Sequence, residues 1–507
     1  MSIRSLPPRY IRAVNLTTIA SLGLAGFVGW AIGRGNLFLA ALPTMVMAGV
    51  ALLERLSLAG WGGLLLLLTV VSRGVVAILG LPEVFNFVHY PAVVAFAAVA
   101  AQRPRRTTTR LPAGRWIAAF LFLTALSSVI NSTHPIRVLM FLLIIGEPMV
   151  VIWAIQRWGM DEATEERLGR LAFAGLLMQI PLGLWQGSVG GWVDSVQGTM
   201  IGHGAGAHVL GGLFALGLFI WLAGVTQGRH SWLTGGIATI VAFGMMSAAG
   251  ALQVILLVAV ALPTIVLVRP SERSLDLGQG DRRRSNSLAR TVIASVLVLF
   301  VLGAIWVELT NSGMSSRAAS LANPREREEF VLARERAASQ PLQFLFGSGP
   351  GTSASRAALL LTDSYNATSG SFLRELPIGP TVLAEKYSRE TKSTSAGGSA
   401  ESAASSILGV VGDLGMLGFI GLALMFLGMY RTSKRLGSWL APAIAAALVM
   451  AFGLSFVDNW LEYPEFSVPL AILIGVGTAT NHCKRKPFHP LAQDHRGVAS
   501  YAHPRGA

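Results

Sequence analysis

The stretch PIRVLMFLLIIGEPMVVIWAI, residues 135–155, carries only two charged side chains, Arg137 and Glu147. About 20 such residues in an α-helix cross the ~30 Å hydrocarbon core of a bilayer. The stretch therefore predicts a membrane-spanning helix. Further candidate spans of the same kind lie at roughly 14–33, 36–53, 60–80, 85–101, 115–131, 168–188, 207–227, 232–248, 250–268, 290–309, 404–429, 438–456 and 465–480.

The composition agrees with a chain built mostly of such helices. Of 507 residues, 52% are hydrophobic and 13% are charged, whereas ordinary globular chains are about 25% charged. These values exclude several soluble domains, a coiled coil or a disordered chain. The single cysteine, Cys483, excludes an intrachain disulfide and a cysteine metal cluster. We expect an all-α polytopic membrane protein with about 14 transmembrane helices (12–14), whose weakest boundaries fall within 60–101 and 232–268.

The positive charge follows the predicted topology. With Met1 in the cytoplasm and the spans alternating, most of the 40 basic residues fall inside, and the short outside loops hold Arg34, Arg73 and Arg137. This is the positive-inside bias of membrane proteins, so the net charge of +14 does not indicate nucleic acid. Both termini are expected inside. The predicted parts are helices 1–11 in 1–309, an outside loop in 310–403, helices 12–14 in 404–480 and a basic cytoplasmic tail in 481–507.

The outside loop contains a predicted helix over 324–339. Asn323 suits its N-cap and Pro324 its first turn. Arg327 and Arg334 share one face of this helix. They form either an anion clamp over the membrane or a solvated face paired with glutamates.

A glycine-rich segment follows that helix. Gly347-Ser-Gly349-Pro-Gly351 places three glycines in five residues, which lets the backbone turn sharply. Two interpretations stay open: free backbone N–H groups that cradle a phosphate, or a plain loop.

Two histidines lie in another outside segment. His203 and His208 are five residues apart and do not share a helical face, so they do not form a regular metal pair. Either one could act as a general base, because histidine titrates near neutral pH. The alternative is a loop that packs at the membrane interface.

Acidic and aromatic residues meet between the last two spans. Asp458, Trp460 and Glu462 suit a sugar, because carboxylates bind hydroxyls and indole rings stack on apolar sugar faces. The tryptophan alone would also fit the aromatic belt at a membrane interface.

Charged residues are scarce within the predicted spans. Glu147 and Glu308 lie within or near spans, and Arg73 and Arg137 lie near outer ends. No span carries a series of acids or histidines such as a proton relay needs, which argues against an ion-driven pump.

Three short motifs occur in order on the predicted outer side. They are Gly198-Thr199 before a long helix, the segment from Ser316-Arg317 through Arg325 and Arg334 to 341–351, and 408–418 around Asp413-Leu-Gly415. With the many spans and the large loop before the last few, they make the chain resemble the O-antigen ligase/polymerase superfamily, bacterial membrane glycosyltransferases. Ligases of that family carry a His-Asn pair where this chain has Ala404 and Ser405, and often a Ser-Arg where it has 247–250. A polymerase therefore fits better than a ligase.

The resemblance implies transfer of a glycan from polyprenyl diphosphate to an acceptor glycan, on the outer face of the bacterial cytoplasmic membrane. Arginines would bind the departing diphosphate, because their planar forks match its oxygens. No cofactor and no metal are required. The partners would be the lipid-linked glycan, the acceptor, the bilayer and other polysaccharide assembly proteins, with no nucleic acid. The expected residues are Arg317, Arg325, Arg327, Arg334 and Arg356 for the diphosphate, Glu401, His203 and His208 for proton transfer, and Asp458, Trp460 and Glu462 for the glycan.

Two other functions fit the same sequence. A transporter or flippase of lipid-linked oligosaccharide would need charged residues within the spans. A structural partner in a polysaccharide assembly complex would tolerate the loss of any single arginine.

Overall fold

The computed structural model describes residues 56–81, 83–103, 114–192, 195–200, 205–268, 340–362, 378–386, 388 and 405–483. Within these ranges the chain forms helices and no strands. The expected spans at 14–33, 36–53 and 290–309 and the expected helix at 324–339 lie outside them. So do most of the predicted loop and residues 484–507.

The helices follow the apolar runs of the sequence closely, as at 232–248 and 115–131. Helix boundaries fall where the weakest divisions were expected, since Gly80 and Gly250 adopt positive φ between successive helices. The elements are α3 (Leu58–Leu66), η2 (Leu67–Val71), α4 (Ser72–Leu79), η3 (Glu83–Phe87), α5 (His89–Gln102), α6 (Gly114–Ile130), α7 (Pro135–Trp158), α8 (Glu162–Gly190), α9 (Gly206–Thr226), α10 (Trp232–Ala248), α11 (Leu252–Leu267), α15 (Pro341–Phe346), α16 (Arg356–Leu359), α19 (Ser406–Ser433), α20 (Ala441–Val457), η6 (Trp460–Glu462) and α21 (Pro464–Cys483).

Six of these helical segments are long and apolar enough to cross a membrane. They are Leu58–Leu79, Phe85–Gln102, Pro135–Trp158, Ala163–Gly190, Gly206–Thr226 and Ser406–Ser433. The apolar helices α6, α10, α11, α20 and α21 are shorter. The all-helical, membrane-type fold is therefore confirmed over the described residues, whereas the total of about 14 spans and the outside loop stay predictions.

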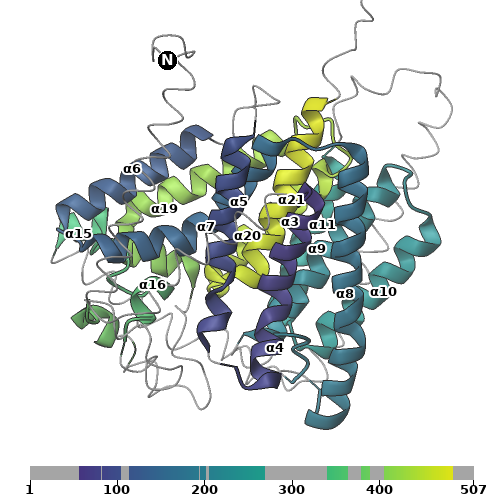
Figure 1. Ribbon diagram of the computed structural model, residues 1–507, viewed down its shortest axis with the longest axis horizontal. Helices are drawn as coiled ribbons and strands as arrows, with labels where there is room; N and C mark the ends of the chain where they lie inside the picture. Colours follow the sequence, from purple (N-terminus) through teal and green to yellow (C-terminus); the bar gives the residue numbers. More distant parts are fainter. Residues whose placement is uncertain are drawn as a thin grey trace, which may run out of the picture.

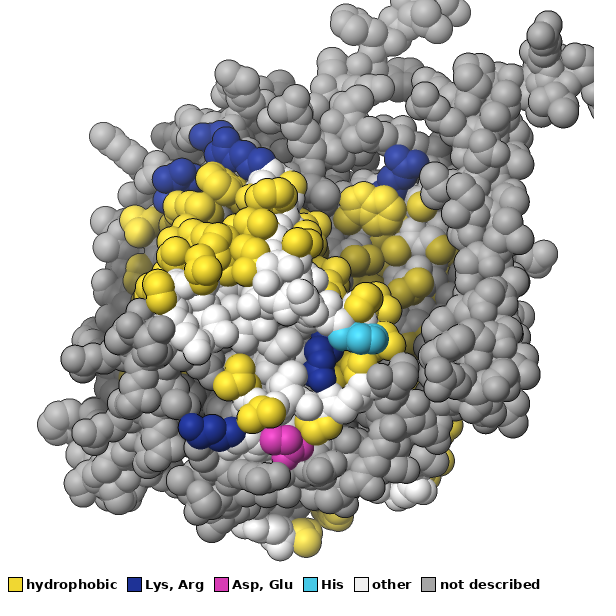
Figure 2. All heavy atoms as spheres, turned by 90° about the vertical axis from the view of Figure 1, so that its left-hand side faces the viewer, with side chains coloured by type: hydrophobic (Ala, Val, Ile, Leu, Met, Phe, Trp, Pro, Cys, Tyr) yellow, Lys and Arg dark blue, Asp and Glu magenta, His cyan; other side chains and the backbone are white. Residues whose placement is uncertain are grey.

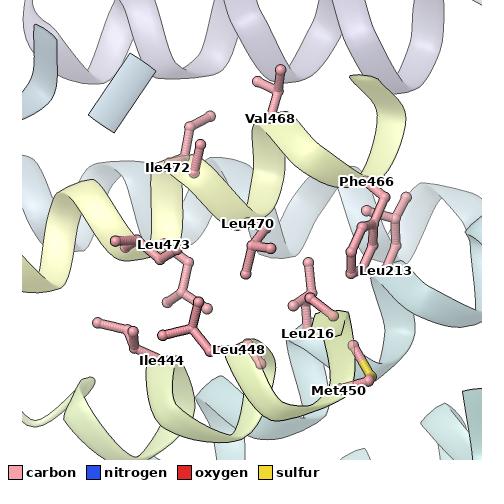
Figure 3. Close-up of a cluster of buried hydrophobic side chains, with 14 of the residues drawn as sticks. Leu213, Leu216, Ile444, Leu448, Met450, Phe466, Val468, Leu470, Ile472 and Leu473 are labelled. Atoms are coloured by element: carbon pink, nitrogen blue, oxygen red, sulfur yellow. The ribbon is translucent and has the colours of Figure 1, made fainter. Parts of the chain in front are cut away.

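The interior is built around α20 and α21, which pack against α9 and α7. Figure 3 shows side chains from α9, α20 and α21 meeting in this core, among them Leu216, Leu448 and Phe466. Small residues allow close approach, as at Gly212, where an added Cβ would lie 2.6 Å from the Trp460 ring. Such packing contacts are the main attraction between helices in lipid, because lipid tails are as apolar as the side chains they replace.

Many of the helices run between two ends of the bundle (Figure 1), and the side-chain contacts at these ends differ. At what we call the basic end, Arg157 donates to the carbonyls of Ala100, Ala101 and Arg103, and the Arg103 guanidinium lies 4.0 Å from the centre of the Trp158 ring. At the opposite end, which we call the loop end, α5, α7, α9, α19 and α21 begin and the segment 340–362 packs. Figure 2 shows a face with a broad apolar area bordered by Lys and Arg side chains.

Candidate functional site

The structure describes five of the predicted site residues. They are His208, Arg356, Asp458, Trp460 and Glu462. The other six, His203, Arg317, Arg325, Arg327, Arg334 and Glu401, lie outside the described residues.

The glycine-rich segment folds around the carboxylate of Asp413 in α19. The backbone N–H of Gly351 donates to Oδ2 at 2.6 Å, and those of Thr352 and Ser353 donate to Oδ1 at 3.3 and 2.8 Å. The Ser355 hydroxyl donates to Oδ2 at 2.5 Å. The segment therefore surrounds an anion, but that anion is the chain's own carboxylate and not a phosphate. These N–H groups are not free to bind a phosphate.

Glycines permit this close approach of loop and helix. Gly347 has φ of 72°, and a Cβ there would lie 2.3 Å from the backbone of Asp413. Gly415 has φ of 71° inside α19, and a Cβ there would lie 2.3 Å from the carbonyl oxygen of Leu345. The break in α19 and the turn of the loop thus fit against each other backbone to backbone.

Arg137 at the start of α7 holds the same segment from the other side. Its Nη1 donates to the carbonyl of Gly351 at 3.3 Å, and its Nη2 donates to the carbonyl of Gly379. The residue is buried, with 8% of its surface exposed, and its guanidinium interacts electrostatically with Asp413. Arg137 therefore joins α7 to two separate pieces of the predicted loop.

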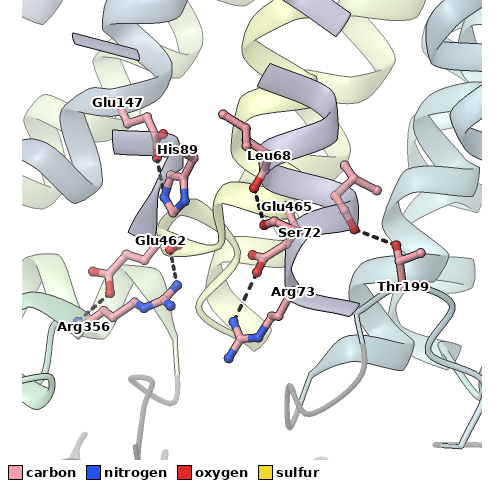
Figure 4. A network of polar contacts seen from close by, with 10 residues as sticks. Leu68, Ser72, Arg73, His89, Glu147, Thr199, Arg356, Glu462 and Glu465 are labelled. Carbon is pink, nitrogen blue, oxygen red and sulfur yellow. Dashed lines mark hydrogen bonds and ion pairs between the residues drawn. The ribbon is translucent and has the colours of Figure 1, made fainter. Parts of the chain in front are cut away.

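The structure brings together Arg356, expected at the diphosphate, and Glu462, expected at the glycan (Figure 4). The Arg356 backbone N–H donates to Oε2 of Glu462 at 2.6 Å, and its guanidinium donates to the Glu462 carbonyl at 2.9 Å. Asn459 Nδ2 also donates to Oε2, at 2.7 Å. Burial raises the pKa of Glu462 to about 7, although the hydrogen bonds from Asn459 and Arg356 oppose the shift.

The side chains of Trp460 and Asp458 make packing and hydrogen-bond contacts within the protein. The Trp460 ring is fully buried and packs edge-on against Phe466, with centroids 4.9 Å apart, so in this structure it presents no face to a sugar. One carboxylate oxygen of Asp458 accepts from the Asn459 backbone at 2.7 Å and from the Tyr463 hydroxyl at 3.3 Å. Both residues shape the turn between α20 and α21.

The Gly198-Thr199 motif docks α8 to the break between α3 and α4. Thr199 donates from its backbone to Gln179 at 2.8 Å and from its hydroxyl to the Val70 carbonyl at 2.6 Å. His208 lies in the first turn of α9, and its Nδ1 is buried without a hydrogen-bond partner among the described residues. The structure therefore gives the motif a packing role and does not join His208 to Arg356 or Glu462.

Sequence reasoning missed an ionic cluster within the helices. Arg73 in α4 pairs with Glu465 in α21 at 3.2 Å. His89 in α5 faces Glu147 in α7, with Nε2 and Oε2 3.6 Å apart, and both side chains are buried. Figure 4 shows these pairs beside Arg356 and Glu462. We call these six residues, Arg73, His89, Glu147, Arg356, Glu462 and Glu465, the ionic cluster.

The scarcity of charge within single spans does not extend to the folded bundle. Among the described residues, the apolar run of no single helix carries a series of acids or histidines, but the fold collects single residues from six different elements. Arg73 and Glu147 were visible in the sequence as isolated charges, whereas His89 gave no such signal. Among the described residues no three His, Cys, Asp or Glu side chains are placed to hold a metal ion.

No protein-family model matches the chain, and the search of curated proteins finds no match.

Proposed function

We propose that the protein is a bacterial membrane glycosyltransferase that polymerises or transfers polyprenyl-diphosphate-linked oligosaccharide in surface polysaccharide synthesis. The observation that supports this most is the docking of Arg356, a loop residue, onto Glu462 beside Arg73 and Glu465. The reaction needs cations near a departing diphosphate and carboxylates near a hydroxyl. The loop end holds both kinds of group together.

The proposed reaction breaks the bond between the anomeric carbon of the glycan and the diphosphate. A hydroxyl of the acceptor forms the new bond and loses its proton. Arg317, Arg325, Arg327 and Arg334 are proposed to bind the diphosphate, and Glu401 and His203 remain candidates for the proton.

The proposed orientation places the basic end in the cytoplasm and the loop end outside. At the basic end the Arg229 guanidinium lies 4.9 Å from the Trp439 ring and Lys434 Nζ lies 4.5 Å from the Tyr430 ring. Cations beside interfacial aromatic rings are typical of the cytoplasmic boundary. At the loop end the described arginines are Arg73, Arg137 and Arg356, and each is engaged by the protein.

A second candidate function rests on the same ionic cluster. Ionisable side chains within membrane helices mark transport pathways in many proteins. A transporter or flippase of lipid-linked oligosaccharide would use the cluster rather than the loop arginines.

The two functions separate in a purified system. Lipid-diphosphate oligosaccharide is added to the wild-type protein and to Arg325→Ala and Arg334→Ala, with Arg170→Ala as control because Arg170 is 70% exposed on α8. We expect a ladder of longer glycans from wild type and Arg170→Ala, and loss of the ladder in the two loop variants. A single product on a different acceptor indicates a ligase. Unchanged substrate with all four folded proteins contradicts a transferase and favours transport.

A further inference from the structure

The charges of the ionic cluster do not balance. Three carboxylates, those of Glu147, Glu462 and Glu465, are buried near two guanidinium groups, those of Arg73 and Arg356. Glu147 interacts electrostatically with Glu465 and Arg356, and His89 with Arg356 and Arg73. With every carboxyl ionised and His89 neutral, the cluster has one negative charge in excess. An excess charge among buried helices is costly, so the cluster needs one more positive charge.

Among the described residues, no neighbouring charge outside the cluster supplies it. The negative charge of Asp413 is balanced by Arg137, which interacts with it electrostatically. Tyr90 stacks beside His89, with ring centroids 4.1 Å apart, and a tyrosine is neutral at ordinary pH. On the elements that pack against α5 and α7, the described charged side chains outside the cluster are Arg137 and Arg157, and Arg157 lies at the basic end, where it donates to the carbonyls of Ala100, Ala101 and Arg103.

Hydrogen bonds show which carboxyl lacks a stabilised anionic form. Glu462 Oε2 accepts from the Arg356 backbone and from Asn459, and Glu465 Oε1 pairs with Arg73. Glu147 receives no hydrogen bond among the described residues: Oε1 has no partner and Oε2 faces only His89. Bonds to the charged form keep a carboxyl ionised, so Glu147 is the one best suited to be protonated.

His89 is arranged to share that proton. Its ring makes a hydrogen bond to the backbone of Asn86, and Nε2 has no hydrogen-bond partner. The bond to Asn86 therefore uses Nδ1, whose N–H donates to the carbonyl. A neutral His89 then points the lone pair of Nε2 at a carboxylate oxygen 3.6 Å away. Two acceptors facing each other repel, and one proton between them turns the contact into a hydrogen bond.

We propose that Glu147 and His89 form a proton-binding site within the helical bundle, which holds the one proton that the ionic cluster needs. This inference does not depend on the proposed function. In a transferase the site would be a buried group that exchanges a proton close to the arginines. In a transporter it would bind the proton whose movement is coupled to transport.

The test uses the full-length protein in lipid nanodiscs well above pH 7, where Glu462, whose pKa is about 7, is ionised. Infrared difference spectra report a protonated carboxyl by its C=O band, which shifts in D₂O, and ¹⁵N spectra of labelled histidine report whether both ring nitrogens of His89 carry protons. His89→Gln assigns the His89 signal. We expect either one carboxyl band that Glu147→Gln removes, or an imidazolium signal from His89. Glu166→Gln is the matched control, because Glu166 is 68% exposed.

Several results would overturn the proposal. One is a neutral His89 together with no carboxyl band that depends on Glu147. Another is a band that disappears in Glu462→Gln but persists in Glu147→Gln, because the proton would then belong to Glu462. A third is a proton that is present in choline buffer and lost in Na⁺ buffer, which would assign the balancing charge to a metal cation. If Glu147→Gln does not fold, Glu147→Asp keeps the acid, and the wild-type ¹⁵N spectrum still decides the state of His89.

Discussion

The two ends of the bundle bury their cations to different depths. At the basic end Arg229 and Lys434 are exposed and lie over aromatic rings. At the loop end Arg137 and Arg356 are buried, and their guanidinium groups donate to backbone carbonyls of distant segments. An exposed cation over a ring contributes little to stability and can be replaced, whereas a buried arginine fixes the position of what it contacts. The difference indicates that the loop end is built to hold a defined geometry.

The largest effect is expected where the loop end encloses a charge. Asp413→Ala removes the carboxylate that three backbone N–H groups and Ser355 bind, and leaves those donors buried without an acceptor. We expect a loss of about 3–5 kcal/mol, or no folded protein, as for other broken buried networks. Asp161→Ala is the control, because Asp161 caps the exposed end of α8, and it should cost about 1 kcal/mol. Equal thermal shifts for the two variants in detergent would contradict the enclosed-anion description.

The pH dependence of stability should differ between the ends because of Glu462. Its pKa is raised from 4.5 to about 7, so the folded protein binds a proton that the unfolded chain releases between these values. Stability from this group is full below pH 4.5 and is lost as the pH rises to about 7, by up to about 3 kcal/mol. In Glu462→Gln the midpoint of unfolding should no longer fall as the pH rises through this range. A midpoint that falls equally in wild type and variant would show that Glu462 does not titrate there.

The helix break at Gly415 is expected to tolerate no side chain. Gly415→Ala places a Cβ at positive φ and 2.3 Å from the Leu345 carbonyl, so we expect a loss of about 1–3 kcal/mol and a displaced loop. In α10, Gly244 has no neighbouring atom within 4 Å of an added Cβ. Gly244→Ala should therefore be neutral or stabilising by up to about 1 kcal/mol. Protease cleavage of the loop, faster only in Gly415→Ala, would report the displacement; cleavage at the wild-type rate would contradict it.

The smallest effect belongs to the basic end. Arg229→Ala removes a cation lying 4.9 Å from the Trp439 ring, and such exposed pairs contribute about 0.5–1 kcal/mol. Thermal unfolding should shift little, and Arg229→Lys should restore the wild-type value. A loss of stability in Arg229→Ala as large as that in Asp413→Ala would contradict the proposed difference between the two ends.

The helices could be predicted from the sequence, because a run of apolar residues is a local property. The run at 232–248 matches Trp232–Ala248, and Gly250 ends it as a turn residue does. The site could be predicted only in pieces. Arg73 and Glu465 are 392 positions apart, and nothing local links them. The glycine turn at 347–351 was visible, but its anion proved to be Asp413, about 60 residues away, which only the folded chain reveals.

His89 illustrates the limit most clearly. A lone histidine at the start of an apolar helix resembles an ordinary interface residue by composition. Its importance comes from Glu147, which α7 places 3.6 Å from its ring. Packing between helices creates this pair, so no pattern within either helix could indicate it.

One measurement tests most directly whether the loop end is the functional end. Each end has a buried glutamate that accepts from a side chain of a distant segment: Glu465 from Arg73 at the loop end, and Glu165 from the Trp439 indole at the basic end. Glu465→Gln and Glu165→Gln are compared for glycan lengthening on lipid-diphosphate oligosaccharide, with equal amounts of folded protein. We predict that Glu465→Gln lowers the rate at least about tenfold and that Glu165→Gln retains the wild-type rate. Equal rates in the two variants, whether both retained or both lost, would contradict the account.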